Sequence, residues 1–134
     1  METVISKPYA EVTYSDLIIS VVWKSGDFTT SEFNELYTQT LKYGETVDPI
    51  GFYTDLRNQR VMSPNERSWF QDNAVPRAVE LGMKYVAVVF TGNIFKRYYL
   101  NNIMNTVSKF GVPMKFFSKP EEAKAWLHDM MNNG

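Results

Sequence analysis

The feature that most constrains this chain is the alternation of short β-type runs with amphipathic helical stretches. Residues 9–14 alternate between apolar and polar side chains, which is typical of a half-buried strand. Residues 17–24 are apolar almost throughout, and we predict that they pair with the first run as an antiparallel hairpin. Three further strands are predicted at residues 49–56, 84–90 and 114–117.

One helical stretch precedes these last three strands, and another follows each of them. The predicted order is therefore β-β-α-β-α-β-α-β-α. Strands that alternate with helices pair in parallel through right-handed crossovers. We therefore predict an α/β fold with a mixed sheet of four or five strands. No internal repeat or low-complexity linker interrupts the chain, which favours a single domain over residues 1–134.

Polar residues that accept hydrogen bonds from free backbone donors mark the predicted helix starts. Thr29 and Glu32 have the spacing of a capping box, and Ser63, which precedes a proline, is a predicted N-cap. The second helix is predicted over residues 64–81, but Pro76 lies within it and removes one internal hydrogen bond. We expect a kink or a break at that proline.

Charge and composition exclude several classes of function. The chain has 15 acidic and 14 basic side chains and a net charge of −1, which provides no electrostatic footprint for nucleic acid or an anionic membrane. Basic and aromatic residues interleave over residues 95–99, but two cations are too few for a nucleic-acid interface. No signal peptide is visible, and no run approaches the roughly 18 apolar residues of a membrane span. We therefore expect a cytoplasmic protein without membrane insertion.

Catalytic and metal-binding residue types are scarce. The chain has no cysteine, which removes disulfides and thiolate chemistry, and one histidine, His128, which lies off the inner face of the last predicted helix. Neither a nucleophile–base pair nor an ordinary zinc set can be assembled from these residues. Thr91-Gly92-Asn93 follows a strand, but one glycine does not make a phosphate-binding loop. We expect a protein that is not an enzyme, with no cofactor and no metal.

The first candidate binding surface is the loop after the third predicted strand, with Asp55, Arg57, Asn58, Arg60 and Ser63. Ligands gather outside the carboxyl ends of parallel strands, where helix N-termini offer free backbone donors. Two arginines at a helix start can hold a carboxylate or a phosphate. The alternative interpretation is that Asp55 pairs with Arg57, that Ser63 is only an N-cap and that the other side chains are solvated.

Aromatic residues are abundant, with nine phenylalanines, eight tyrosines and three tryptophans. Helical phase places Tyr98 away from the apolar stripe of its helix, with Phe95 and Tyr99 on the flank, and Trp69 falls off the stripe of the second helix. Exposed aromatics indicate a protein interface, often a homodimer. The alternative is that the irregularity at Pro76 or a covering loop buries them.

Several short segments spread over nearly the whole chain share one resemblance. They are Val21-Val22-Trp23-Lys24, Tyr53-Thr54-Asp55-Leu56-Arg57-Asn58, Trp69, Pro76-Arg77-Ala78, Gly82-Met83-Lys84-Tyr85-Val86-Ala87-Val88 and Pro120-Glu121-Glu122-Ala123-Lys124-Ala125-Trp126-Leu127. With the order of strands and helices, they resemble the STAS domain, the fold of bacterial anti-sigma-factor antagonists. The likeness is nearest to the divergent branch of small bacterial SpoIIAA-like proteins.

The chain departs from the regulatory members of that family at one motif. Those members carry an Asp-Ser-Ser-Gly type motif at the start of the helix after the third strand, where a kinase phosphorylates a serine. The corresponding stretch here is Val61-Met62-Ser63-Pro64-Asn65-Glu66, without the acidic residue, the second serine and the glycine. Ser63 is a candidate phosphorylation site by position alone.

The resemblance implies a non-catalytic, regulatory or protein-interaction module that binds a protein partner or itself. The implied surface is the loop of residues 57–63 with the start of the second helix and Trp69. The second hypothesis is a carrier of a small apolar or lipid-like ligand, because related folds enclose such molecules and both faces of the predicted sheet are apolar. The two hypotheses differ in whether a second protein chain or a small molecule is retained.

Overall fold

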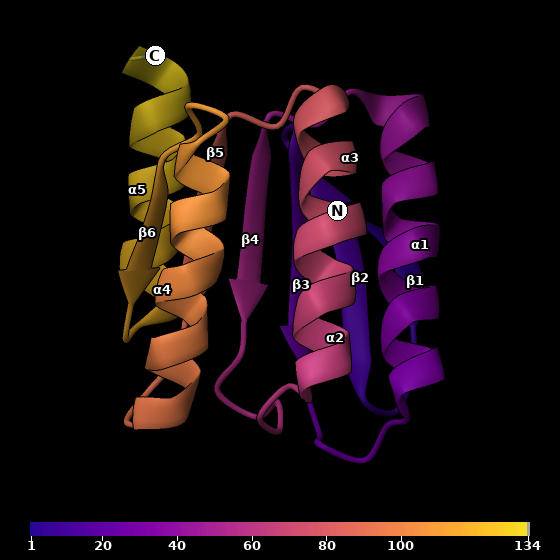
Figure 1. The fold of residues 1–134 in the computed structure, drawn as a ribbon. Coiled ribbons are helices and arrows are strands. Elements are labelled where there is room, and N and C mark those ends of the chain that lie inside the picture. The colour runs from indigo at the N-terminus through magenta and orange to yellow at the C-terminus, as the bar shows by residue number, and fades with distance from the viewer. Residues whose placement is uncertain (134) are drawn as a thin grey trace.

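A six-stranded mixed sheet forms the centre of the computed structural model, which describes residues 1–133 (Figure 1). The strands lie in the order of the chain, β1-β2-β3-β4-β5-β6. Strands β1, β2 and β3 pair antiparallel, and β3 to β6 pair in parallel. Their bounds are β1 Glu2–Ser6, β2 Ala10–Ser15, β3 Ile18–Trp23, β4 Gly51–Asp55, β5 Tyr85–Val89 and β6 Met114–Phe117.

Helices cover both faces of this sheet. On one face lie α1, α4 and an interrupted helix made of α2, the π-helical segment η1 and α3, whereas α5 packs behind β4, β5 and β6 (Figure 1). Their bounds are α1 Thr30–Val47, α2 Pro64–Trp69, η1 Phe70–Ala74, α3 Val75–Glu80, α4 Ile94–Ser108 and α5 Pro120–Asn133. Within residues 1–133, no helix has the length and apolar character needed to cross a membrane.

The predicted α/β class and the hairpin are confirmed, but the predicted number of strands is wrong. Ala10–Ser15 and Ile18–Trp23 pair antiparallel across a two-residue turn in which Asp16 and Leu17 have positive φ. The additional strand is β1, five mostly exposed residues at the edge of the sheet. Its three β-branched or aliphatic residues (Thr-Val-Ile) form a run too short to distinguish a strand from an extended terminus.

The predicted interruption of the second helix occurs just before Pro76. Phe70–Ala74 forms one π-helical turn, and the helix resumes as α3 at Val75. A proline ring clashes with the carbonyl group four residues earlier in a regular α-helix, and the wider π-turn relieves that clash. Phe70 and Ala74 consequently face the sheet from a locally widened turn.

Many of the aromatic side chains pack in the core between the sheet and the helices on the face that α1 covers. Trp23 packs against Phe28, Phe33 and Tyr37, and its indole nitrogen donates to the Tyr37 hydroxyl at 3.4 Å. Tyr37 in turn contacts Phe70 edge-on. These rings fill the space over β2 and β3, and the neighbouring space over β4 and β5 is filled less completely.

Candidate ligand cavity

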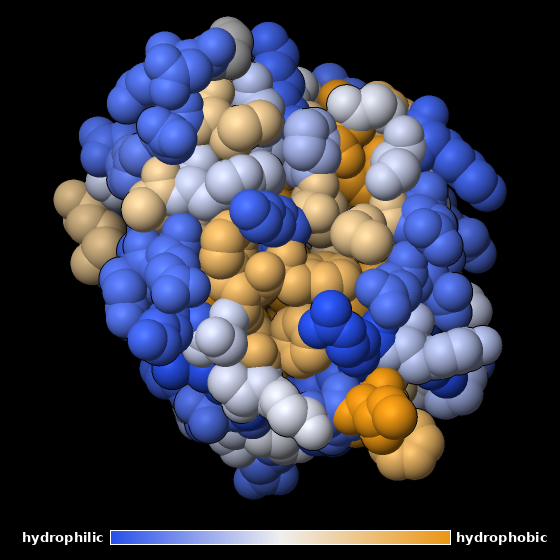
Figure 2. All heavy atoms as spheres, turned by 90° about the vertical axis from the view of Figure 1, so that its left-hand side faces the viewer, coloured by the Kyte–Doolittle hydropathy of each residue, from blue (hydrophilic) through white to orange (hydrophobic). Residues whose placement is uncertain are grey.

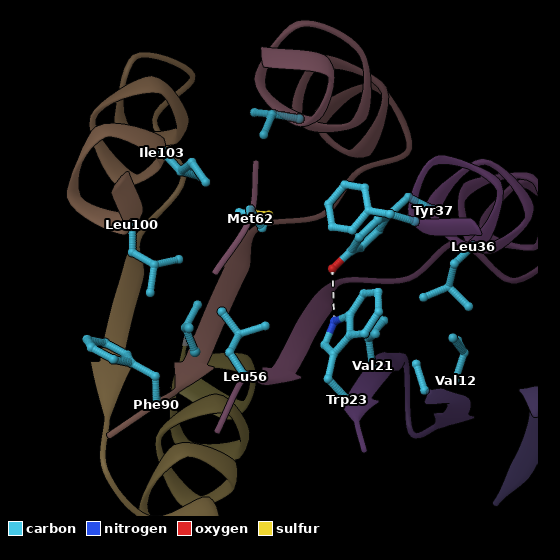
Figure 3. Close-up of a cluster of buried hydrophobic side chains, with 14 of the residues drawn as sticks. Val12, Val21, Trp23, Leu36, Tyr37, Leu56, Met62, Phe90, Leu100 and Ile103 are labelled. Atoms are coloured by element: carbon cyan, nitrogen blue, oxygen red, sulfur yellow. Dashed lines mark hydrogen bonds between the residues drawn. The ribbon is translucent and has the colours of Figure 1, made fainter. Parts of the chain in front are cut away.

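An apolar cavity of about 80 Å³ lies over β4 and β5, between the sheet and the helices on its α1 side. Figure 3 shows part of its wall, with Leu100 and Ile103 of α4 across from Tyr37 of α1 and Met62 between them. The lining residues are Tyr37, Thr40, Leu41, Phe52, Thr54, Leu56, Gln59, Met62, Phe70, Ala74, Val75, Ala78, Val79, Met83, Val86, Val88, Leu100, Ile103, Val107, Val112 and Met114. The wall therefore combines three helices with the helix-facing side of the sheet.

The residues that line the cavity are spread along the strands. Phe52, Val86 and Met114 occupy one row across β4, β5 and β6, and Leu56 lies four residues further along the chain from Phe52. At about 3.3 Å per residue the two levels are about 13 Å apart. The row at Phe52 is half-buried, whereas Leu56 and Gln59 are buried, so the wall is more deeply buried at the Gln59 end than at the other.

Gln59 is the unusual residue of the wall. It is 3% exposed, and neither its side-chain oxygen nor its side-chain nitrogen has a hydrogen-bond partner among the residues that the structure describes. The other polar side chains of the wall are engaged: Thr40 and Thr54 donate to backbone carbonyls, and Tyr37 accepts from Trp23. Burying an amide without a partner costs free energy, so Gln59 is not a side chain that stability alone would favour in an apolar wall.

A turn after β4 places Gln59 in the wall. Its backbone N–H donates to the Leu56 carbonyl at 3.2 Å, and the Nζ of Lys96 donates to the same oxygen at 2.6 Å. The Asp55 carboxylate accepts from the Arg57 backbone at 3.1 Å, which closes the first half of the turn. Burial lowers the pKa of Lys96, and the nearby charge of Asp55 opposes that shift. Lys96 is itself buried and supports this turn from α4.

Arg60 fixes the other end of the turn. Its two terminal nitrogens donate to the two carboxylate oxygens of Glu66 at 2.8 and 2.7 Å, and it also donates to the Phe28 carbonyl at 3.1 Å. The guanidinium lies 4.0 Å from the centre of the Phe28 ring. The loop is thereby tied both to α2 and to the segment before α1.

Glu66 is fully buried and receives hydrogen bonds from three directions. Besides Arg60, the Ser63 backbone N–H donates at 3.0 Å and the Thr30 hydroxyl at 2.8 Å. Burial alone would raise the pKa of Glu66, but the bonds from Arg60, Ser63 and Thr30 outweigh burial and lower the pKa to about 2. The carboxylate is therefore charged at neutral pH and forms an ion pair with the Arg60 guanidinium.

The predicted loop residues lie together, but their charged groups are paired within the loop and its neighbours. Asp55 and Arg57 form the ion pair of the alternative interpretation, with nitrogen and oxygen 2.6 Å apart, and Arg60 pairs with Glu66. Asn58 is exposed. The free pair of arginines that would hold an anion is therefore not formed, and these residues instead hold the turn that carries Gln59.

Ser63 is the N-cap of α2, as predicted. Its hydroxyl accepts from the Glu66 backbone N–H at 3.2 Å, and Glu66 completes the capping box. A phosphate on this hydroxyl would break the box and would lie beside the buried Glu66 carboxylate, which is unfavourable for two negative charges. Nothing else in the structure singles out this hydroxyl for modification.

The aromatic interface candidates divide into exposed and buried residues. Phe95 and Tyr98 are 70% and 69% exposed, as their helical phase predicted. Tyr99 is a correction: it is buried, and its hydroxyl accepts from the Met62 backbone at 3.4 Å, because its side of α4 faces the start of α2. Trp69 is half-buried, and its ring packs edge-on against Phe33.

Residues suited to metal binding do not gather in the described part of the chain. No group of three histidine, cysteine, aspartate or glutamate side chains there could hold a metal ion, and His128 is exposed on α5. Sequence reasoning missed Gln59, Glu66 and Lys96, since polar residues in a loop or at a helix start usually face solvent. The Ser63–Glu66 spacing was the one available signal, because it predicts a capping box.

The chain was also compared with known proteins. No family model matches it, and neither a curated protein nor a solved structure does so. The STAS resemblance consequently stays a prediction from the sequence, and what the residues can do has to be inferred from the cavity and its wall.

Proposed function

We propose that this domain is a non-catalytic carrier or sensor that binds a small, largely apolar molecule in the cavity over β4 and β5. The observation that carries the proposal is Gln59, whose buried amide has no partner in the described structure and lines a cavity that is otherwise apolar. A core that served stability alone would be more stable with an apolar side chain at this position.

The size of the cavity limits the ligand. An engineered cavity of about 150 Å³ binds benzene, so about 80 Å³ accommodates roughly three to five non-hydrogen atoms without rearrangement. Met62, Met83 and Met114 line the wall, and methionine side chains re-pack readily around an occupant. Short-chain or compact molecules therefore fit best.

Xenon tests the cavity directly, because it is apolar, compact and needs no specific contact. The full chain is labelled at the methionine methyl groups, and NMR spectra are recorded under increasing xenon pressure. The methyl groups of Met62, Met83 and Met114 are expected to shift saturably. Met131, which packs in the core on the α5 side, is the internal control and is expected not to shift. Absence of any saturable shift would contradict the proposal.

A filled cavity provides the matched variant. Ala78 lines the cavity, and Ala78→Leu adds apolar volume there; Ala125→Leu makes the same change on the exposed face of α5. Ala78→Leu is expected to abolish the xenon response, and Ala125→Leu to leave it unchanged. An unchanged response in Ala78→Leu would place xenon elsewhere and would overturn the assignment of the site.

A second candidate function is the interaction module that the STAS resemblance implies, acting through self-association. The observation that favours it is a cluster of large apolar side chains at the start of α4, where Ile94 is 77% exposed beside Phe95 and Tyr98. Figure 2, which views the molecule from the β6 side, shows apolar residues at the centre of this face and at its lower edge. We take a second copy of the chain as the partner.

Native mass spectrometry at two protein concentrations tests this second candidate and also records any retained small molecule. Self-association predicts a dimer that grows with concentration and is lost in Tyr98→Ala. Asn101→Ala changes another exposed side chain of α4 and is expected to leave the dimer intact. A monomer at both concentrations would exclude self-association through this surface.

A further inference from the structure

The two polar atoms of the Gln59 side chain define what the cavity recognises. A glutamine amide presents an acceptor oxygen and a donor nitrogen side by side. Both atoms are buried and without a partner in the part of the chain that the structure describes. A group that satisfies both at once must itself carry a donor and an acceptor at the same spacing.

We propose that the ligand carries a neutral carboxamide or un-ionised carboxyl group that pairs with the Gln59 amide, and a short apolar body that extends along β4 in the direction of Phe52. This inference rests on the proposed function, since it names the ligand chemistry of the same cavity. A hydrocarbon alone would fill the cavity but leave Gln59 unsatisfied, which costs binding free energy.

The charges around the cavity require the polar group to be neutral. Among the residues that the structure describes, the cavity wall contains no lysine, arginine, histidine, aspartate or glutamate. The two cations that hold the Gln59 loop already have partners: Arg60 pairs with Glu66, and Lys96 donates to the Leu56 carbonyl. A carboxylate would therefore be buried without a counter-ion, which is far more costly than burying a hydrogen-bonded amide.

The direction of the ligand follows from the shape of the cavity. Gln59 lies in the deeply buried part of the wall, and the row of Phe52, Val86 and Met114 is half-buried. The polar group of the ligand accordingly lies at the Gln59 end, and its apolar body points toward the row of Phe52, Val86 and Met114 without reaching it. Probes of this polarity are expected to shift the Gln59 amide and the methyl group of Met62, which belongs to the same loop and lines the cavity.

Three probes of equal size and shape isolate the amide. Propionamide has the donor and the acceptor, butan-2-one has the acceptor only, and 2-methyl-1-butene has neither. The full chain, labelled with nitrogen-15 in its glutamine side chains, is titrated with each probe and followed by NMR. Propionamide is expected to shift the Gln59 side-chain amide saturably, and 2-methyl-1-butene to shift the methionine methyl groups with a much smaller effect on that amide.

The variant Gln59→Met keeps the volume and removes the amide. We expect the ratio of the propionamide to the 2-methyl-1-butene dissociation constant to rise by about tenfold or more in this variant, because two hydrogen bonds to the ligand are lost. Gln39→Met makes the same substitution at an exposed position of α1 and is expected to leave the ratio unchanged.

The outcomes separate this inference from the proposed function. An unchanged ratio in Gln59→Met, or a Gln59 amide that propionamide does not shift, overturns the recognition of a carboxamide while xenon or 2-methyl-1-butene still bind. A Gln59 amide held by a long-lived water that propionamide cannot displace overturns it as well. If neither xenon nor any of the three probes binds, the proposed function and this inference fail together.

Discussion

Arg60 and Glu66 meet end-on, with guanidinium nitrogens 2.8 and 2.7 Å from the two carboxylate oxygens. The pair joins the loop after β4 to the first turn of α2, and the Thr30 hydroxyl connects the same carboxylate to α1. Gln59 is the residue next to Arg60, so this pair determines how the loop presents Gln59 to the cavity. The polar network holds the loop that carries Gln59, and its own charged groups are paired with one another.

Removing one partner of the pair leaves a charge uncompensated. Glu66→Gln is expected to lower the free energy of unfolding by about 2–4 kcal/mol, since Arg60 then lacks its counter-ion. The expected loss is below that of a fully buried pair because the Arg60 side chain is 33% exposed. Urea unfolding at neutral pH measures it.

The exposed pair of Arg77 and Glu45 provides the control for that measurement. The Glu45 side chain is 50% exposed, so Glu45→Gln is expected to cost less than about 1 kcal/mol. If both variants lose the same free energy of unfolding, burial does not make the Arg60–Glu66 pair more stabilising than an exposed pair.

The pKa of Glu66 predicts how stability depends on pH. The folded protein holds this pKa at about 2, below the usual 4.5, so between these values the unfolded chain binds a proton that the folded chain does not. The stabilisation is therefore complete above about pH 5 and is lost as the pH falls toward 2; it amounts to about 3 kcal/mol. Urea unfolding between pH 6 and 3 should show a smaller decrease in Glu66→Gln than in the unaltered protein. Equal decreases would contradict the assignment to Glu66.

Thr30 contributes one of the hydrogen bonds to Glu66. Thr30→Val keeps the shape of the side chain and removes the bond of 2.8 Å, and we expect a loss of about 1–2 kcal/mol at neutral pH. Thr38→Val, which makes the same change at an exposed position of α1, should cost less than about 0.5 kcal/mol. A loss that persists undiminished at pH 2, where about half of the Glu66 carboxylates are protonated, would argue against a bond to the carboxylate.

Gln59 is predicted to lower the stability of the ligand-free domain. Gln59→Met replaces an unpartnered buried amide by an apolar side chain of similar length, and we expect the free energy of unfolding to rise by about 1–3 kcal/mol. Most substitutions in a core are destabilising, so the sign alone is informative. Thermal unfolding of the two proteins measures the change. A loss of stability in Gln59→Met would mean that the amide is satisfied within the protein.

Much of the fold followed from patterns that are local in the sequence. The hairpin, the α/β class, the cap at Ser63 and the interruption near Pro76 each depend on residues a few positions apart. Strand β1 was missed because only pairing with β2 makes its five residues a strand. The exposure of Phe95 and Tyr98 followed from helical phase, whereas the burial of Tyr99 depends on where α2 begins.

The candidate site named from the sequence lies in the loop that carries Gln59, but Gln59 was not among its residues. Asp55, Arg57 and Arg60 carry charge and therefore attracted attention, yet their partners lie within the loop or just beyond it. Gln59 is an uncharged residue in a polar segment, and nothing in the sequence shows that its side chain faces inward. Its burial follows from the turn back to the Leu56 carbonyl and from Arg60 reaching Glu66, and such contacts appear only in three dimensions.

Methionine-methyl NMR of the unaltered protein under xenon tests the central claim most directly. The account predicts saturable shifts at Met62, Met83 and Met114, which line the cavity, and none at Met131 on the α5 side. Uniform shifts at all of these methyl groups, or none at any of them, would contradict the presence of a ligand-binding cavity over β4 and β5.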